Sequence, residues 1–226
     1  MAKNESKLED QFQQVEQALT KTEQFIEDNQ NVIVKVVVAI VVIIALVFGY
    51  NNFYIKPLEN EAQTEMYIAE NYFQKDSFNL ALNGDGQYLG FIDIADEYSL
   101  TKAGALANYY AGLSYLHLGN FEEAIDYLKD FSSSDEILST LALGCIGDAY
   151  LELDDSNQAL SYYNKAINNS ANKFTTPRYM LKKAFILEDN NNFNDALEIY
   201  NKIKMDYPDS REGNGIDKYI SRSSNR

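Results

Sequence analysis

The segment GLSYLHLGNFEEA at residues 112–124 decides the fold, because its spacing of small and aromatic residues recurs along the chain. Its counterparts are AENYFQKDSFNLA at 69–81, GDAYLELDDSNQA at 147–159 and AFILEDNNNFNDA at 184–196. Successive copies are offset by 43, 35 and 37 residues. Such a period is typical of a solenoid, in which a unit buries its apolar faces only by stacking on its neighbours.

This spacing resembles the tetratricopeptide repeat, a helix-turn-helix unit of about 34 residues. The resemblance implies an all-α, right-handed solenoid of about four repeats, in which the first helix of each repeat, helix A, lines a concave face. In that family a small residue of helix A packs on a small residue of helix B, because larger side chains would hold the backbones apart. The pairs implied here are Gly112 with Ala124, Gly147 with Ala159, and Ala184 with Ala196.

The first copy departs from the pattern after Ala81, where the chain continues LNGDGQYLGFIDIADEYSLT. We expect its second helix to be interrupted or lengthened before the next repeat starts at Thr101. Gly84, Gly86 and Gly90 superficially resemble a dinucleotide-binding loop, but such a loop follows a strand, and helical sequence flanks this one. We therefore interpret the insertion as an adapted edge of the solenoid.

The resemblance also implies which helix A positions face the groove. Their apolar residues are Met66, Phe73, Tyr109, Leu113, Leu116, Leu141, Leu151, Leu181 and Phe185, and their acidic rim is Asp148, Glu152, Glu188 and Asp189. The set of Lys, Asn and Arg with which some relatives hold carboxylates is missing. An apolar groove of this kind favours an amphipathic helix or an extended apolar segment with basic flanks. The alternative is that these residues pack inside the superhelix or under the segment after Gly215.

Before the repeats the chain reads VIVKVVVAIVVIIALVFGY from Val32, and the apolar character extends to Tyr54. A helix of that length measures about 34 Å and would cross a hydrocarbon core of about 30 Å. Lys35 can extend its ammonium group to the lipid headgroups at one membrane interface. The aromatic residues near Tyr50 are typical of an aromatic belt at the other interface. The acidic leader before Val32 and the LVFGYNN after the run are not typical of a cleaved signal peptide. The run is thus predicted to be a permanent transmembrane helix.

Lysines near the run are slightly more numerous on its N-terminal side, which favours a cytosolic N-terminus and a translocated repeat domain. In a bacterium this places the protein in the inner membrane with its solenoid in the periplasm. A cytosolic solenoid remains the alternative. The predicted organisation is a cytosolic amphipathic helix at 1–31, the transmembrane helix at 32–54, the solenoid at 57–210 and a C-terminal tail at 211–226.

The cytosolic segment has apolar residues at heptad spacing. They are Leu8, Phe12, Val15, Leu19, Thr22 and Ile26. This pattern predicts an amphipathic helix. This helix either docks on a partner or forms a coiled coil. The alternative is that it is a frayed tail, since a helix of about three heptads is only marginally stable in isolation.

Charge and composition restrict the function. The chain has 34 acidic and 19 basic residues, a net charge of −15, which argues against nucleic-acid binding. It has one histidine, His117, and one cysteine, Cys145, which we expect to be a small buried residue. No catalytic motif is found, so no enzyme activity, cofactor, metal or small-molecule substrate is predicted.

A short cytosolic helix, one membrane helix and a tetratricopeptide solenoid together resemble the YfgM-like ancillary translocon subunits. The resemblance implies binding to the SecYEG channel, to periplasmic chaperones and to secretory clients. The predicted function is an interaction module that binds emerging or partly folded proteins through the groove. The alternative is a structural scaffold of a cell-envelope complex that binds one folded partner.

Overall fold

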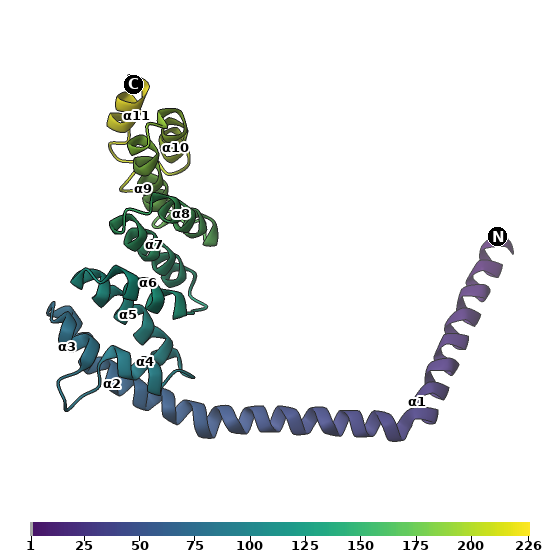
Figure 1. The fold of residues 1–226 in the computed structure, drawn as a ribbon. Coiled ribbons are helices and arrows are strands. Elements are labelled where there is room, and N and C mark those ends of the chain that lie inside the picture. Colours follow the sequence, from purple (N-terminus) through teal and green to yellow (C-terminus); the bar gives the residue numbers. More distant parts are fainter. Residues whose placement is uncertain (1) are drawn as a thin grey trace. The chain divides into compact units, whose positions relative to one another are not determined.

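The computed structural model describes the backbone of residues 2–226 and the side chains of residues 23–226. Its secondary structure in that range consists of helices joined by turns and loops, without strands (Figure 1). The chain divides into two compact units, Met1–Lys56 and Pro57–Arg226. The heptad residues before residue 23 lie outside the described side chains, so the prediction of an amphipathic face stays a prediction.

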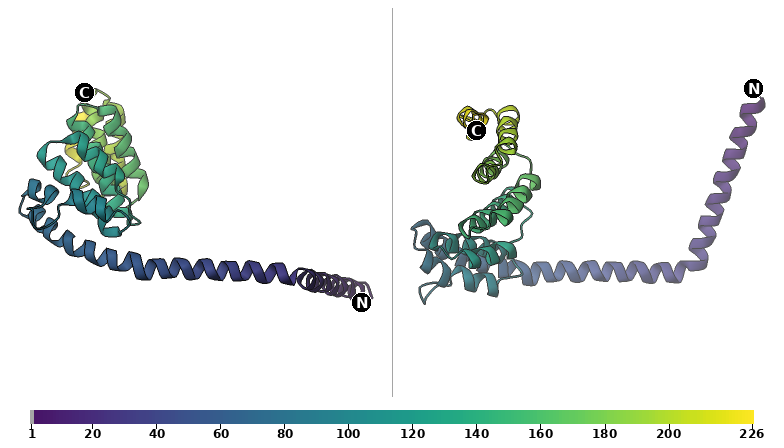
Figure 2. Two further views of the ribbon diagram at one scale, coloured as in Figure 1. Left: turned by 60° about the horizontal axis from the view of Figure 1, so that its bottom comes forward. Right: turned by 45° about the horizontal axis from the view of Figure 1, so that its top comes forward.

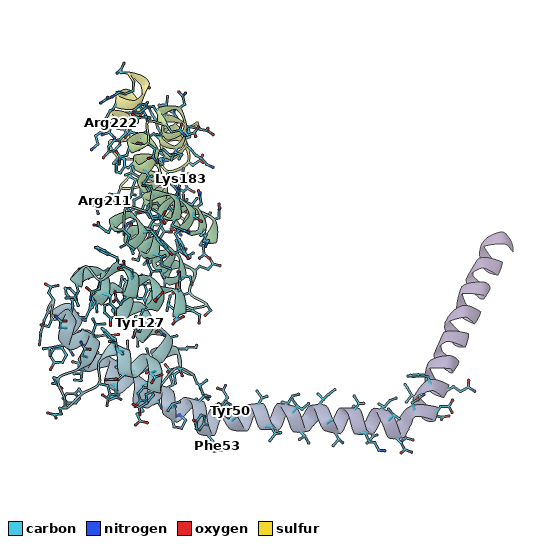
Figure 3. The ribbon with its side chains drawn as sticks, in the orientation of Figure 1. Tyr50, Phe53, Tyr127, Lys183, Arg211 and Arg222 are labelled. Carbon is cyan, nitrogen blue, oxygen red and sulfur yellow. The ribbon has the colours of Figure 1, made fainter. Side chains whose placement is uncertain are left out.

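The first unit contains α1 (Ala2–Tyr50) and a short π-helical turn, η1 (Asn51–Ile55). From Val36 to Phe48 its large apolar side chains are between 50% and 68% exposed. Tyr50 and Phe53, which Figure 3 labels, are also exposed, and Tyr50 stacks on Tyr54 with ring centroids 5.2 Å apart. The helical stretch Glu23–Gln74 is long and apolar enough to cross a membrane.

The second unit stacks helix pairs in chain order, as the two views of Figure 2 show. The regular pairs are α5 (Lys102–Leu118) with α6 (Phe121–Asp130), α7 (Glu136–Glu152) with α8 (Ser156–Asn169), and α9 (Thr176–Asp189) with α10 (Phe193–Asp206). Helix α10 ends two residues before Pro208, as expected of a closing proline. The predicted all-α repeat solenoid is confirmed.

The turn inside each repeat closes in the same way. One residue has a left-handed backbone at the corresponding position of every copy, namely Asp76, Gly119, Asp154 and Asn191, with φ between 55° and 79°. The next amide then donates back to a carbonyl of helix A, as Asn120 does to Tyr115 at 2.9 Å and Asn192 to Leu187 at 2.8 Å. This bond closes the helix end in a Schellman motif. Gly, Asn and Asp tolerate the left-handed conformation, which explains their recurrence in the repeat.

Small residues let the two helices of a repeat approach closely. Ala124, Ala159, Ala184 and Ala196 are fully buried. A Cβ on Gly112 would lie 2.5 Å from Cγ of Leu128 and 3.2 Å from the Ala124 carbonyl oxygen. At Gly147, by contrast, the nearest atoms belong to the Tyr163 ring, 2.6 Å from a Cβ, rather than to Ala159. The space at Gly147 is therefore filled by an aromatic ring.

The first repeat consists of α2 (Lys56–Gln74), the short α3 (Phe78–Asn83) and, after the glycine-bearing loop, α4 (Phe91–Glu97). The loop brings two stretches of backbone into contact. A Cβ on Gly90 would lie 2.1 Å from the Leu82 carbonyl oxygen, and one on Gly84 2.1 Å from that of Tyr88. Helix α4 then buries Phe91 and Ile94 completely against the same core. The second helix is thus interrupted, and the glycines serve chain packing.

The segment 211–226, expected to be a tail, contains α11 (Asp217–Ser224), which packs on α10. Ile216 is only 2% exposed, and Tyr219 and Ile220 join the core formed by α9 and α10. The final repeat of a solenoid has no neighbour on one side, so its apolar face needs such a cover.

Candidate functional site

The residues expected to line the groove differ widely in exposure. Met66 and Tyr109 are buried, at 4% and 8%, whereas Leu151 is 40% exposed. The other six are half-buried, namely Phe73, Leu113, Leu116, Leu141, Leu181 and Phe185. Part of the expected groove floor is therefore core, and its accessible part follows helices α5, α7 and α9.

An aromatic cluster occupies the part of the first repeat around Phe73, at the C-terminal end of α2. The ring of Phe73 meets those of Phe78 and Tyr110 edge-on, with centroids 5.4 Å and 5.2 Å away. His117 stacks on Phe78 with a centroid distance of 4.4 Å. Phe73 and His117 thus act in packing between the first two repeats.

Phe185 packs partly under the segment after Gly215, which is the alternative that the sequence analysis left open for the groove residues. Its ring lies edge-on to Tyr219 of the C-terminal segment, with centroids 5.1 Å apart, and also meets Tyr200 at 6.5 Å. The residue remains half-buried, so Tyr219 of α11 covers only part of it. It is a poorer reporter of partner contact than Leu151.

Two of the four acidic rim residues bind other side chains of the solenoid. Asp148 accepts a hydrogen bond from the Tyr163 hydroxyl at 2.6 Å and pairs with Lys182 at 2.5 Å. This network joins helices α7, α8 and α9. Glu188 pairs with Arg222 and accepts a hydrogen bond from Ser223, both on α11. Only Glu152 and Asp189 remain as exposed rim carboxylates.

Three hollows lie along helices of the groove. The first, of about 460 Å³, lies between α2 and α5 over Met66 and Leu106. The acidic hollow, of about 280 Å³, is lined by Leu151, Glu152 and Asp189 among others. Beside it, sharing Lys182 and Phe185, is the basic hollow, of about 560 Å³. The groove therefore changes its charge along α9, from basic around Arg178 in its N-terminal half to acidic at Asp189 at its C-terminal end.

Sequence reasoning missed most of the basic hollow. Lys173 and Phe174 belong to the loop before α9, and Arg211 to the loop after α10. The repeat pattern selects positions on helix A alone, so loop residues that reach the groove from outside leave no periodic signal. Only the exposed Phe174, unusual in a polar loop, could have drawn attention to it.

The titratable groups of the groove are suited to structure rather than catalysis. Burial, reinforced by the charge of Asp148, raises the pKa of the Cys145 thiol to about 11, so the thiolate is scarce at neutral pH. Burial and the neighbouring Asp148 also raise the pKa of Tyr163 well above its ordinary value. Among the described residues, no group of three or more His, Cys, Asp or Glu side chains could hold a metal ion.

Comparison with known proteins agrees with this architecture. Residues 143–173 match one sequence model of the tetratricopeptide repeat, and residues 106–134 and 178–210 match another. The first repeat, with its interrupted second helix, is not among these matches. No curated protein sequence matches the chain.

A similar solved structure is that of the nearly identical TPR-like repeats, in a Q17M variant, ascribed to a kinesin light chain of Podosopora anserina. The TM-score is 0.55 at 10% identity, over 74% of this chain and 86% of that one. That similarity concerns the fold alone. The fold and the sequence matches define the class: a helical-repeat solenoid that contains tetratricopeptide repeats, and such repeats indicate a protein–protein interaction module.

Proposed function

We propose that this protein is a membrane-anchored interaction module that holds segments of other proteins in its groove beside the membrane, in the manner of an ancillary translocon subunit. The observation that carries the proposal is a line of accessible apolar side chains, Leu113, Leu151 and Leu181, on the helix A face. The solenoid that bears them follows directly in sequence on an exposed apolar helix.

The anchor serves the groove by raising its effective concentration at the membrane. A segment that leaves a protein-conducting channel such as SecYEG would then meet the groove without three-dimensional search. Each leucine that a partner covers completely stabilises the complex by up to about 1.5–3 kcal/mol before the costs of association. Several half-buried leucines therefore support weak, reversible binding, which suits emerging or partly folded clients and periplasmic chaperones.

The proposed topology places residues 1–31 in the cytosol, 32–54 in the membrane and the solenoid in the periplasm of a bacterium. Fusions of alkaline phosphatase and of a fluorescent protein after Arg226 test it. An active phosphatase and a dark fluorescent protein are expected. The reverse pattern would put the solenoid in the cytosol and remove the translocon role.

Photo-crosslinking from positions 113 and 151 in living cells tests client binding, with the exposed Lys202 of α10, which lines none of the three hollows, as a control site. Newly made secretory chains and channel subunits are expected at 113 and 151 and not at 202. Capture of a single mature protein in stoichiometric yield would contradict client binding.

That last outcome would support the second candidate, a scaffold for one folded partner. One observation favours it: the Asp148 and Glu188 networks hold helices α7, α8, α9 and α11 together. A groove fixed in this way is preorganised, which reduces the ordering cost of binding one well-matched surface.

A further inference from the structure

The basic hollow has an unusual charge for this protein. Four of its lining residues are cations, Lys173, Arg178, Lys182 and Arg211, and one, Glu212, is an acid. The whole chain has 34 acidic and only 19 basic residues. Cations thus gather at one place on a solenoid that is otherwise strongly negative.

One face of α9 forms the floor of the hollow. Arg178, Leu181, Lys182 and Phe185 follow one another at spacings of three, one and three residues, which places them on the same side of the helix. The side chains of Leu181 and Phe185 are half-buried, so the floor is apolar and the cations lie beside it.

The loop before α9 adds Lys173 and Phe174 to the hollow. The side-chain oxygen of Asn172 accepts hydrogen bonds from the amides of Phe174 and Thr175 at 2.9 and 2.8 Å. Its side-chain amide donates to the Thr175 hydroxyl at 2.7 Å. The loop is therefore held in one conformation, although the Phe174 side chain is 79% exposed.

The loop after α10 contributes Arg211 to the lining of the hollow. Ser210, only 8% exposed, donates its hydroxyl hydrogen to the Tyr207 carbonyl at 2.8 Å and accepts from the Gly213 amide at 2.9 Å. A Cβ on Gly213 would lie 2.2 Å from the Tyr207 carbonyl oxygen, so this tight turn needs glycine. Arg211 is thus presented by a hydrogen-bonded turn.

The positive charge of the hollow is not neutralised within the solenoid. Lys182 pairs with Asp148 at 2.5 Å. Among the described side chains, no carboxylate lies within 4 Å of the charged groups of Lys173, Arg178 or Arg211, all of which are exposed. Counting both Glu212 and Asp148 against the four cations still leaves an excess of two positive charges.

We propose that the basic hollow binds a partner protein segment in which acidic residues flank an aromatic or large aliphatic side chain. The apolar residue would lie against Leu181, Phe185 and Phe174, and the carboxylates would meet Arg178 and Arg211. Arg suits this role because its planar guanidinium binds carboxylates through two hydrogen bonds. The inference rests on the proposed groove function and names the chemistry of the partner at one end of the groove.

Charge also gives the bound segment a direction. The adjacent acidic hollow presents Glu152 and Asp189, so the acidic end of the segment belongs over the basic hollow and any basic flank over the acidic one. A protein segment is favoured over an anionic lipid surface, because residues 57–226 carry 27 acidic and 14 basic groups and would be repelled by anionic headgroups.

The test uses the full chain in nanodiscs of zwitterionic lipid and two fluorescein-labelled, C-terminally amidated peptides with the same two phenylalanines. One peptide carries four aspartates, and the other carries four lysines in their places. Fluorescence anisotropy is expected to show at least tenfold tighter binding of the aspartate peptide at 50 mM NaCl. Raising the salt to 300 mM should weaken that binding severalfold.

The double variant Arg178→Glu with Arg211→Glu should lose at least tenfold in affinity for the aspartate peptide. The matched control is Lys183→Glu with Lys202→Glu, which makes the same change of charge outside the hollow, and it should change the affinity by less than twofold. Figure 3 labels Lys183 and Arg211 on different sides of this part of the ribbon. Thermal unfolding followed by circular dichroism confirms that both variants are folded.

Three results would overturn the proposal: equal binding of the two peptides, an equal loss in the control variant, or displacement of the aspartate peptide by phosphatidylglycerol added to the nanodiscs. The last would assign the hollow to a lipid. Crosslinking from positions 113 and 151 distinguishes failure of this proposal from failure of the proposed groove function. If only this proposal is wrong, partners are still captured at positions 113 and 151.

Discussion

At the scale of single residues, Asp148 is central to the solenoid. Its carboxylate lies on α7 and binds Tyr163 of α8 and Lys182 of α9, so one side chain joins two consecutive repeats. Tyr163 is fully buried, and a hydrogen bond from a buried hydroxyl to a charged group contributes more to stability than one at the surface.

Tyr163→Phe removes this hydroxyl and leaves Asp148 with one partner fewer. We expect a loss of about 1.5–3 kcal/mol in the free energy of unfolding, measured by urea titration with circular dichroism. Tyr162→Phe is the control, since its ring stacks on Tyr150 and its hydroxyl makes no hydrogen bond within residues 23–226, whose side chains the structure describes. Equal losses in the two variants would mean that the Asp148 contact contributes nothing.

Glu188 gives the attachment of α11 a dependence on pH. Burial alone would raise its pKa, but hydrogen bonds from Arg222 and Ser223 outweigh burial and hold the pKa below its ordinary value of 4.5. Because the pKa of Glu188 is lowered in the folded state, its carboxylate contributes to stability above pH 4.5. This contribution is lost as the pH falls through the folded-state pKa. Figure 3 labels Arg222, the cation of this pair.

We therefore expect Glu188→Gln to be less stable than the native protein at pH 7 and the difference to shrink as the pH is lowered below 4.5. Urea titrations between pH 7 and 3.5 measure this. A difference that is constant over the whole range would show that the charge of Glu188 does not hold α11.

At the scale of elements, the four turns within repeats explain why such different sequences form the same unit. Each turn needs one left-handed residue, and the chain supplies Asp, Gly, Asp and Asn in turn. The pattern of small residues and turns is local, so the sequence alone predicted the helix pairs at 112–124, 147–159 and 184–196.

Two substitutions in these turns should have opposite effects. Gly119→Ala places a Cβ on a backbone with φ of 79° and should cost about 1 kcal/mol, although open space surrounds it. Asn191→Gly relieves a milder strain at φ of 61° and should be neutral or slightly stabilising. Thermal unfolding of both variants measures the effects. A loss in both would show that the turn conformation is not what limits stability.

The interruption of the second helix in the first repeat was predicted, but the separate helix α4 and the helix α11 in the expected tail were not. Both lie outside the repeat period, and each exists to cover an apolar face that a regular neighbour would otherwise cover. Phe91 and Ile94 of α4 complete the first repeat, and Ile216 with Tyr219 completes the last. A need of this kind depends on which faces remain open after stacking, and that is not a local property of the sequence.

At the scale of the whole molecule, the solenoid is stabilised by contacts between neighbours in the chain. Such a molecule loses structure from its ends, because an end repeat has only one neighbour. Ending the chain at Gly215 should therefore expose the amides of α9 and α10 to faster hydrogen exchange and leave those of α5 and α6 unchanged. Mass spectrometry measures both. Faster exchange throughout would indicate that the repeats unfold together.

The sequence by itself determined the helical repeat, its turns and the long apolar helix, because spacing and hydropathy along the chain specify them. The protein-interaction class followed from the resemblance of that spacing to the tetratricopeptide repeat. Only the tertiary structure decided which groove residues are accessible. It buried Met66 and Tyr109, covered part of Phe185 with α11 and bound Asp148 and Glu188 internally. It also brought Arg211 from a distant loop to the face of α9, because stacking of helices joins residues that no period along the chain connects.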